Sequence, residues 1–156
     1  MKSGSLEQSI LIVDDQPENI RILTELLKAE YRIRVATSGE KAIQAALSDH
    51  PPDLILLDIV MPIMNGYEVC ETIKRFPASH NIPIIFITSQ SCEKDEVKGF
   101  EVGAVDYITK PFNPTVVKAR VRTHAELKRY RDVLENTMLT DALTGLPNRR
   151  KFEISY

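Results

Sequence analysis

Residues 9–15 read SILIVDD, a run rich in Ile and Val that ends in two aspartates. Short apolar runs of this kind are typical of strands buried on both faces of a parallel sheet. Three further segments have the same form: LILLD at residues 54–58, IPIIFIT at 82–88 and VDYITKP at 105–111. In each of the four, the apolar run leads into a polar side chain, and open parallel sheets bind ligands at the carboxyl ends of their strands. The sequence therefore predicts a parallel sheet with a ligand site along one edge.

Helix-forming segments separate these strands and a further one at residues 31–36. Pro17 suits the first turn of the first helix. Thr37 and Glu40 have the spacing of a capping box for the second helix, and Asn65 is placed to cap the third. Strand and helix thus alternate five times, with the fourth helix expected at residues 93–102. We expect an α/β fold, a flavodoxin-like doubly wound five-stranded parallel sheet in the order 2-1-3-4-5.

The last helix is expected to be unusually long. Asn113 is its predicted N-cap and Pro114 its first residue, and no Gly or Pro follows until after residue 139. At ~1.5 Å per residue, this extended C-terminal helix would span roughly 39 Å, more than the width of a small domain. Apolar and small residues recur in alternating steps of three and four, as in a two-stranded coiled coil, with Arg120 interrupting the seam. The seam residues are Val116, Thr123, Leu127, Tyr130, Leu134 and Thr137. The alternative is a helix that lies along its own domain with a solvated outer face.

Composition excludes several classes of function. A chain of 156 residues with a formal net charge of −2 is expected to form one domain with an appendage, and not to coat nucleic acid or an anionic membrane. The last helix does carry a basic cluster, which we interpret as a solvated face because no nucleic-acid-reading motif accompanies it. Its members are Lys118, Arg120, Arg122, Lys128, Arg129 and Arg131. No apolar run reaches the roughly 20 residues of a membrane helix, and no signal peptide is visible, so we expect a cytoplasmic location.

The polar strand ends can handle both a metal ion and phosphate. Asp14, Asp15 and Asp58 would supply carboxylate oxygens, which are the ligands that Mg²⁺ prefers. Three carboxylates held together need a counter-charge, which Mg²⁺ and the ammonium of Lys110 would provide. A carboxylate can also accept a phosphoryl group, and the hydroxyl of Thr88 could donate a hydrogen bond to it. Taken singly, each residue could be a cap, a turn residue, a surface lysine or an ordinary strand residue. Together they favour a phosphoryl site.

Residues 8–125 resemble the receiver domain of two-component response regulators. The resemblance is carried by ILIVDD at residues 10–15, LLDIVMPIMNG at 56–66, FITS at 86–89 and DYITKPF at 106–112. It implies that Asp58 is the phosphoacceptor, and that Thr88 and Lys110 contact the phosphoryl group. It also implies a cis peptide bond between Lys110 and Pro111.

The same resemblance implies a metal site and a switch. The metal ligands for Mg²⁺ would be Asp14, Asp15, Asp58 and the backbone carbonyl of Val60, and the switch residues would be Thr88 and Tyr107. The phosphodonor would be a sensor histidine kinase or a phosphotransfer protein. A homodimer would form through the face of helix four, strand five and helix five, through the C-terminal helix, or through both.

The end of the sequence resembles a second family. TDALTGLPNRRKF at residues 140–152 resembles the opening of a diguanylate cyclase (GGDEF) domain, whose Gly-Gly-containing loop is not in this sequence. We therefore expect residues 126–140 to be a linker helix and residues 141–156 the start of a GGDEF-type output domain in a longer protein. Residues 1–7 are expected to be a disordered N-terminus that includes cloning residues. The alternative is a naturally short receiver with a helical tail.

Two other classes of function compete with a receiver, which transfers phosphate only to itself. One is a Mg²⁺-dependent phosphatase with an aspartyl-phosphate intermediate. Haloacid dehalogenase phosphatases carry Asp-x-Asp after strand one, whereas Asp14 and Asp15 are adjacent here and the nucleophile candidate follows strand three. The other is a structural adaptor with a degenerate site, which is disfavoured because every receiver position holds a competent residue.

Overall fold

The computed structural model of the chain describes residues 8–89, 98 and 100–143. The strands are β1 (Ser9–Val13), β2 (Arg32–Ala36), β3 (Leu54–Asp58), β4 (Ile84–Thr88) and β5 (Asp106–Thr109). The helices are α1 (Pro17–Leu27), α2 (Gly39–Ala46), α3 (Gly66–Arg75) and α5 (Pro114–Leu143). Most of the predicted fourth helix lies outside the described residues, although Lys98, Phe100 and Glu101 are helical.

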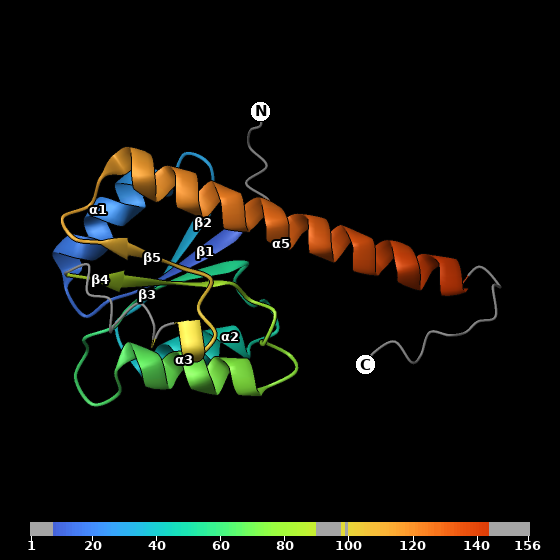
Figure 1. Cartoon of the computed structure of the whole chain (residues 1–156), viewed down its shortest axis with the longest axis horizontal. Helices are drawn as coiled ribbons and strands as arrows, with labels where there is room; N and C mark the ends of the chain where they lie inside the picture. The colour runs from blue at the N-terminus through green and yellow to red at the C-terminus, as the bar shows by residue number, and fades with distance from the viewer. Residues whose placement is uncertain (1–7, 90–97, 99, 144–156) are drawn as a thin grey trace.

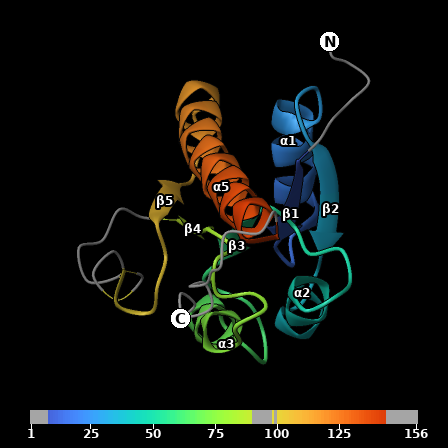
Figure 2. The ribbon, with the colours of Figure 1, turned by 90° about the vertical axis from the view of Figure 1, so that its right-hand side faces the viewer.

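All five strands pair in parallel, in the predicted order β2-β1-β3-β4-β5. Helices α1 and α5 cover one face of the sheet, and α2 and α3 cover the other (Figures 1 and 2). Side chains alternate between these faces along each strand. Ile10 and Ile12 of β1 pack towards α1 and α5, whereas Leu11 and Val13 pack towards α2 and α3. The three fully buried strands β1, β3 and β4 are therefore apolar except at their ends, where Ser9, Asp58 and Thr88 lie, as the sequence indicated.

The register of the central strands aligns their polar ends. Val13 of β1 pairs with Leu57 of β3, so Asp14 and Asp58 follow at the same level. Asp58 in turn pairs with Ile87, one residue before Thr88. Thr88 pairs with Thr109 of β5, and Lys110 comes next along the chain. The predicted site residues are thus carried to one edge of the sheet by strand pairing alone.

Of the two predicted side-chain caps at the starts of α2 and α3, the one for α3 is confirmed and the one for α2 is wrong. Asn65 caps α3 as expected: its side chain accepts from the backbone N–H of Glu68 at 3.0 Å, and the Glu68 carboxylate accepts from the Asn65 N–H at 2.9 Å. The capping box at Thr37 was wrong, because the N-cap of α2 is Ser38, whose hydroxyl accepts from the Lys41 N–H at 3.3 Å. The helix begins at Gly39, where an added Cβ would lie 2.6 Å from Val69 Cγ2.

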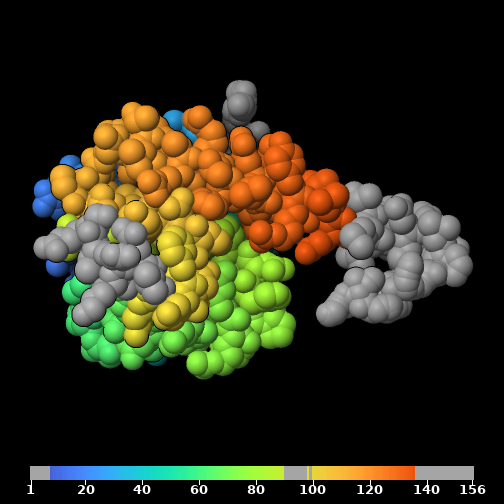
Figure 3. Space-filling view, in the orientation of Figure 1, coloured from blue at the N-terminus to red at the C-terminus, as the bar shows by residue number. Residues whose placement is uncertain are grey.

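Helix α5 is continuous from Pro114 to Leu143, three residues beyond the end predicted for the linker helix at residue 140. The Asn113 side chain accepts from the backbone N–H of Val116 at 3.2 Å, which confirms the predicted cap. Val117, Val121 and Ala125 bury the first half of the helix against the sheet. Figure 1 shows the helix continuing past the sheet, and Figure 3 shows its described side chains there at the edge of the folded body.

The projecting segment exposes part of the predicted seam. Leu127, Tyr130 and Leu134 are 52%, 59% and 63% exposed. No helix within the described residues combines the length and the apolar character that crossing a bilayer requires.

Candidate functional site

Three carboxylates meet at the carboxyl edge of the sheet. One oxygen from each of Asp14, Asp15 and Asp58 lies within 4.8 Å of the other two. Asp14 is completely buried and Asp58 is 3% exposed, whereas Asp15 is partly open to solvent. Like charges this close in a buried site are unfavourable without compensation. The cluster therefore has the properties of a cation site with one solvent-facing side.

Asp14 contributes an oxygen that the protein leaves unsatisfied. Its Oδ1 accepts a hydrogen bond from the backbone N–H of Gln16 at 2.9 Å. Its Oδ2 is buried and accepts no hydrogen bond from any described residue, with the ammonium of Lys110 4.0 Å away. Buried polar atoms are nearly always paired, so an unpaired carboxylate oxygen beside two other carboxylates calls for a ligand. The residues present fit Mg²⁺, which is small, takes oxygen ligands and keeps several waters.

Asp58 is held in a strongly perturbed environment. Its Oδ1 lies 3.7 Å from the Lys110 ammonium and accepts from the backbone N–H of Val60 at 3.4 Å. Burial raises the pKa of the Asp58 carboxyl to about 6, and the neighbouring Asp14 charge adds to the rise. Lys110 and the Val60 N–H act in the opposite direction and lower that pKa. Near neutral pH, Asp58 is thus available as an ionised oxygen nucleophile in a largely water-excluded site.

Gly66 allows the loop after β3 to fold back over Asp58. A Cβ added at Gly66 would lie 2.5 Å from the backbone oxygen of Asp58 and 2.8 Å from the Cα of Ile59. Its N–H donates to the Ile59 carbonyl at 2.8 Å. The sequence motif contains this glycine, but sequence reasoning assigned it no role. Only a close approach between the first residue of α3 and the end of β3 explains it.

Lys110 and Thr88 are tied together at the ends of β4 and β5. The backbone N–H of Lys110 donates to the Thr88 carbonyl at 2.8 Å, and the Lys110–Pro111 peptide bond is cis, as the resemblance implied. Thr88 is buried at the end of β4. The Val60 side chain is 75% exposed beside the site. All the predicted site residues therefore gather at one edge, except Tyr107, which lies further down β5.

Tyr107 belongs to a separate cluster between β5 and α5. Its ring contacts Phe100 edge-on at a centroid distance of 6.4 Å, and the Arg120 guanidinium lies 5.3 Å from the ring centre. Arg120 donates to Asp106 Oδ1 at 2.7 Å and to the Tyr107 carbonyl at 2.9 Å. His124 Nε2 lies 3.1 Å from Asp106 Oδ2. Sequence reasoning missed this cluster, whose one visible signal is the placement of two basic residues four apart on α5.

Comparison with known proteins identifies the family and supports the same fold. The sequence profile of the family described as response regulator receiver domain matches residues 10–122. A probable cyclic di-GMP phosphodiesterase from Vibrio cholerae serotype O1 is 50% identical over 128 residues, which cover 82% of this chain and 29% of that protein. The response regulator PleD from Caulobacter vibrioides is 40% identical over 126 residues, which cover 80% of this chain and 28% of that protein.

One solved structure adds a metal ion to the comparison. It is the receiver domain of a sensor histidine kinase from Pseudomonas aeruginosa PAO1, with a magnesium ion coordinated in the active-site cleft. It is 27% identical, with a TM-score of 0.70, and the match covers 76% of this chain and 98% of that one. The present chain spans less than a third of the length of the two curated relatives above.

Proposed function

Because this chain belongs to the response regulator receiver domain family, we propose that Asp58 accepts a phosphoryl group from a histidine kinase or phosphotransfer protein in a Mg²⁺-dependent reaction. The observation that carries this proposal is the juxtaposition of three carboxylates within 4.8 Å, one with an unsatisfied buried oxygen, and the Lys110 ammonium. In this assignment Asp14, Asp15, Asp58 and the Val60 carbonyl hold the metal. Thr88 and Lys110 contact the phosphoryl group.

The transfer itself requires little covalent chemistry from the protein. A carboxylate oxygen of Asp58 bonds to phosphorus as the bond from phosphorus to the donor's imidazole nitrogen breaks. Lys110, whose ammonium lies 3.7 Å from Asp58 Oδ1, stabilises the charge on the phosphoryl oxygens. Mg²⁺ bound at the carboxylates would supply further positive charge to the same oxygens. Burial of Asp58 excludes most of the water that would compete for the group.

We further propose that phosphorylation changes the face formed by β5 and α5. A phosphoryl group on Asp58 attracts the hydroxyl of Thr88, and Tyr107 moves into the space that Thr88 leaves. Tyr107 is held by Arg120 and Phe100 on this face, so its movement would alter the surface that these residues present. Such a switch only biases two states that already interconvert.

The output of the whole protein is proposed to act on cyclic di-GMP. Residues 140–152 resemble the opening of a diguanylate cyclase domain, and a 50% identical relative is named a probable cyclic di-GMP phosphodiesterase. The sequence resemblance favours synthesis, and the relative's name supports the same second messenger. Receiver dimerisation, through the β5–α5 face or the exposed seam of α5, would bring two output domains together. Equal sedimentation with and without beryllofluoride would contradict dimerisation as the link.

Labelling by acetyl phosphate tests the receiver assignment. The wild-type chain should gain one phosphoryl group per molecule with Mg²⁺, and gain none when Asp58 is replaced by Asn or when EDTA is added. The phosphatase alternative predicts continuous turnover of p-nitrophenyl phosphate instead. Membership of the receiver family does not favour that alternative.

A further inference from the structure

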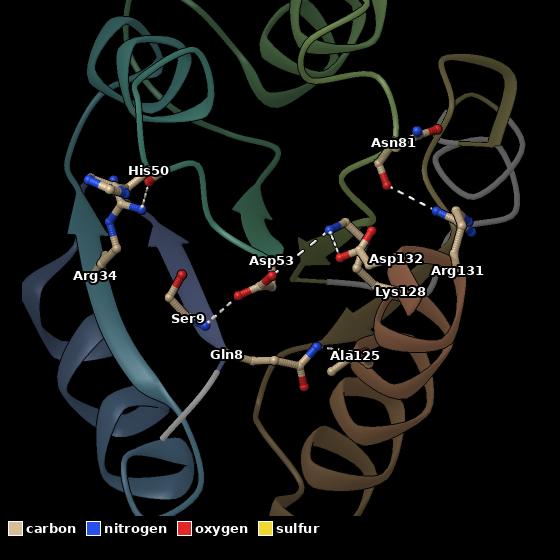
Figure 4. A network of polar contacts seen from close by, with 10 residues as sticks. All are labelled: Gln8, Ser9, Arg34, His50, Asp53, Asn81, Ala125, Lys128, Arg131 and Asp132. Atoms are coloured by element: carbon tan, nitrogen blue, oxygen red, sulfur yellow. Dashed lines mark hydrogen bonds and ion pairs between the residues drawn. The ribbon is translucent and has the colours of Figure 1, made fainter. Parts of the chain in front are cut away.

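A group of polar residues joins one side of helix α5 to the sheet at the point where the helix leaves the domain. We define these six residues as the exit clamp: Gln8, Asp53, Asn81, Lys128, Arg131 and Asp132 (Figure 4). Gln8, Asp53 and Asn81 directly or closely precede β1, β3 and β4. The clamp therefore lies at the amino-terminal edge of the sheet, at the opposite end of the strands from Asp58.

Lys128 is the centre of the clamp. Its ammonium lies 2.7 Å from Asp132 Oδ2 and 3.9 Å from Asp53 Oδ1, and its side chain is only 12% exposed. A lysine four residues before an acidic residue is the weaker orientation of a helical ion pair. The ion pair with Asp132 within the helix therefore does not explain why the Lys128 side chain is largely buried. The contact to Asp53, which comes from the sheet, accounts for its position.

Asp53 is a rigid anchor for Lys128. Its Oδ2 accepts from the backbone N–H of Ser9 at 2.8 Å, and its own N–H donates to the Ser9 carbonyl at 2.9 Å. These two bonds fix the carboxylate between the first residues of β1 and β3. The free oxygen that faces Lys128 is therefore held in place before the ion pair forms.

Two more contacts hold the helix on either side of Lys128. Gln8 Nε2 donates to the Ala125 carbonyl at 2.8 Å, and Arg131 Nη1 donates to the Asn81 carbonyl at 3.1 Å. The loop that carries Asn81 is itself fixed from α3, because Lys74 donates to the Ile82 carbonyl at 2.7 Å and to that of His80 at 3.0 Å. The contacts fall at positions 125, 128 and 131, about one turn apart along the helix.

The clamp coincides with the end of the helix's apolar anchorage. Ala125 is the last buried apolar residue of the described side chains of α5. From Ala125 to Leu143 the helix extends by about 27 Å at 1.5 Å per residue. A small rotation at residue 128 would therefore become a large displacement at residue 143.

We propose that Lys128 is a positioning residue. It fixes the direction in which α5 projects from the receiver by joining the helix to the amino-terminal ends of the central strands. The clamp makes the sheet and the projecting helix one rigid body. It also holds the seam residues Leu127, Tyr130 and Leu134 outward. The proposal rests on the proposed function only in taking this helix as the route from receiver to output.

Pulsed electron–electron distance measurement tests the clamp. Spin labels are attached to cysteines introduced by Glu71→Cys on α3 and Glu135→Cys on the projecting helix, two exposed positions. Cys92 is replaced by Ser, and the buried Cys70 is retained. Labelled protein is diluted with unlabelled protein so that only distances within one chain are read. The unmodified clamp should give a single narrow distance peak.

Lys128→Met should abolish the narrow peak and give a broad distribution, while Lys128→Arg should restore it. Asp53→Asn, which keeps an acceptor for Ser9 but loses the charge, should broaden the peak in the same direction. Lys118→Met, at an exposed position of the same helix, is the matched control and should leave the peak unchanged. Thermal midpoints of all variants are measured to show that the fold is retained.

If both Lys128→Met and Asp53→Asn gave a distance peak as narrow as that of the wild type, the proposal would be overturned. Broadening of the same size in the Lys118→Met control would also overturn it. Acetyl phosphate labelling is measured on the same samples. Failure of the wild type to take up phosphate would contradict the proposed function and leave the distance result standing. Broadening with unchanged phosphate uptake would support the clamp as a device that acts after phosphorylation.

Discussion

The ammonium of Lys110 lies 3.7 Å from the carboxylate of Asp58, although the strands that lead to these residues, β5 and β3, do not pair with each other. β4 lies between β3, which ends at Asp58, and β5, which leads into Lys110. The lysine reaches across the end of β4 and is also 4.0 Å from Asp14. One partly buried ammonium thus faces two buried carboxylates, and this excess of negative charge favours the binding of a further cation.

Lys110→Met should destabilise the metal-free protein at pH 8. The substitution leaves two buried carboxylates without their counter-charge, and we expect the free energy of unfolding to fall by about 1–3 kcal/mol. Urea unfolding in EDTA measures the change. The loss should shrink at pH 5, where Asp58 is protonated. Lys118→Met is the control, and an equal loss in both variants would show that the Lys110 charge has no special role.

Asp58 should make the metal-free protein less stable as pH rises from about 4 to about 7. The folded protein holds the proton until its pKa of about 6, whereas the unfolded chain releases it near the ordinary value, so the folded state binds more protons between these values. The contribution of Asp58 to the free energy of unfolding therefore falls as pH rises. Asp58→Asn should remove that slope and be more stable than wild type at pH 8 by about 1–3 kcal/mol. Urea unfolding across this pH range measures the change, and an identical pH dependence of the unfolding free energy in wild type and Asp58→Asn would contradict the raised pKa.

Mg²⁺ should stabilise the folded chain through the carboxylate cluster. At a free concentration ten times its Kd, the unfolding free energy should rise by about 1.4 kcal/mol. The effect should fade below about pH 6, because protonation of Asp58 competes with the cation. Asp14→Asn and Asp15→Asn should each reduce it in urea titrations with and without Mg²⁺. Asp53→Asn, at the opposite edge of the sheet, should retain the full stabilisation by Mg²⁺. If this variant lost the stabilisation, the cation would be binding non-specifically and not at the carboxylate cluster.

Gly66→Ala should disturb the phosphoryl site more than its size suggests. The added methyl meets backbone atoms of Asp58 and Ile59, which cannot rotate away, and we expect a cost of about 1–3 kcal/mol in unfolding free energy. The rate of labelling by acetyl phosphate should fall with it, because Asp58 must shift. Gly39→Ala is the comparison: its methyl meets side chains of Val69 and Met64, so labelling should stay at the wild-type rate. Unchanged labelling in Gly66→Ala would contradict the positioning role of this contact.

The sheet and the acidic cluster were predictable because they depend on local sequence signals. Buried parallel strands read as continuous apolar runs, and the residue after each run must lie at the carboxyl edge. Asp14, Asp58 and Lys110 follow from this rule once the strand order is known. The cap at Asn65 was predictable for a similar reason, since both partners of its capping box lie within one helical turn.

The features that sequence reasoning missed depend on tertiary contacts. Thr37 and Ser38 can both cap a helix, and the choice falls on Ser38 because Gly39 lets the first turn approach Val69. The exit clamp joins Lys128 to Asp53, residues that no sequence pattern connects. The cluster of Arg120, Asp106 and His124 likewise appears only when β5 and α5 lie side by side.

Chemical mapping of the phosphorylated residue tests the central claim most directly. The wild-type chain is phosphorylated with acetyl phosphate and Mg²⁺, reduced with borohydride, and digested for peptide sequencing by mass spectrometry. Reduction of an aspartyl phosphate converts the side chain to that of homoserine, and the account predicts this residue at position 58 and at no other aspartate. Homoserine at Asp14 or Asp15, or its complete absence from a chain shown to be folded, would contradict the account.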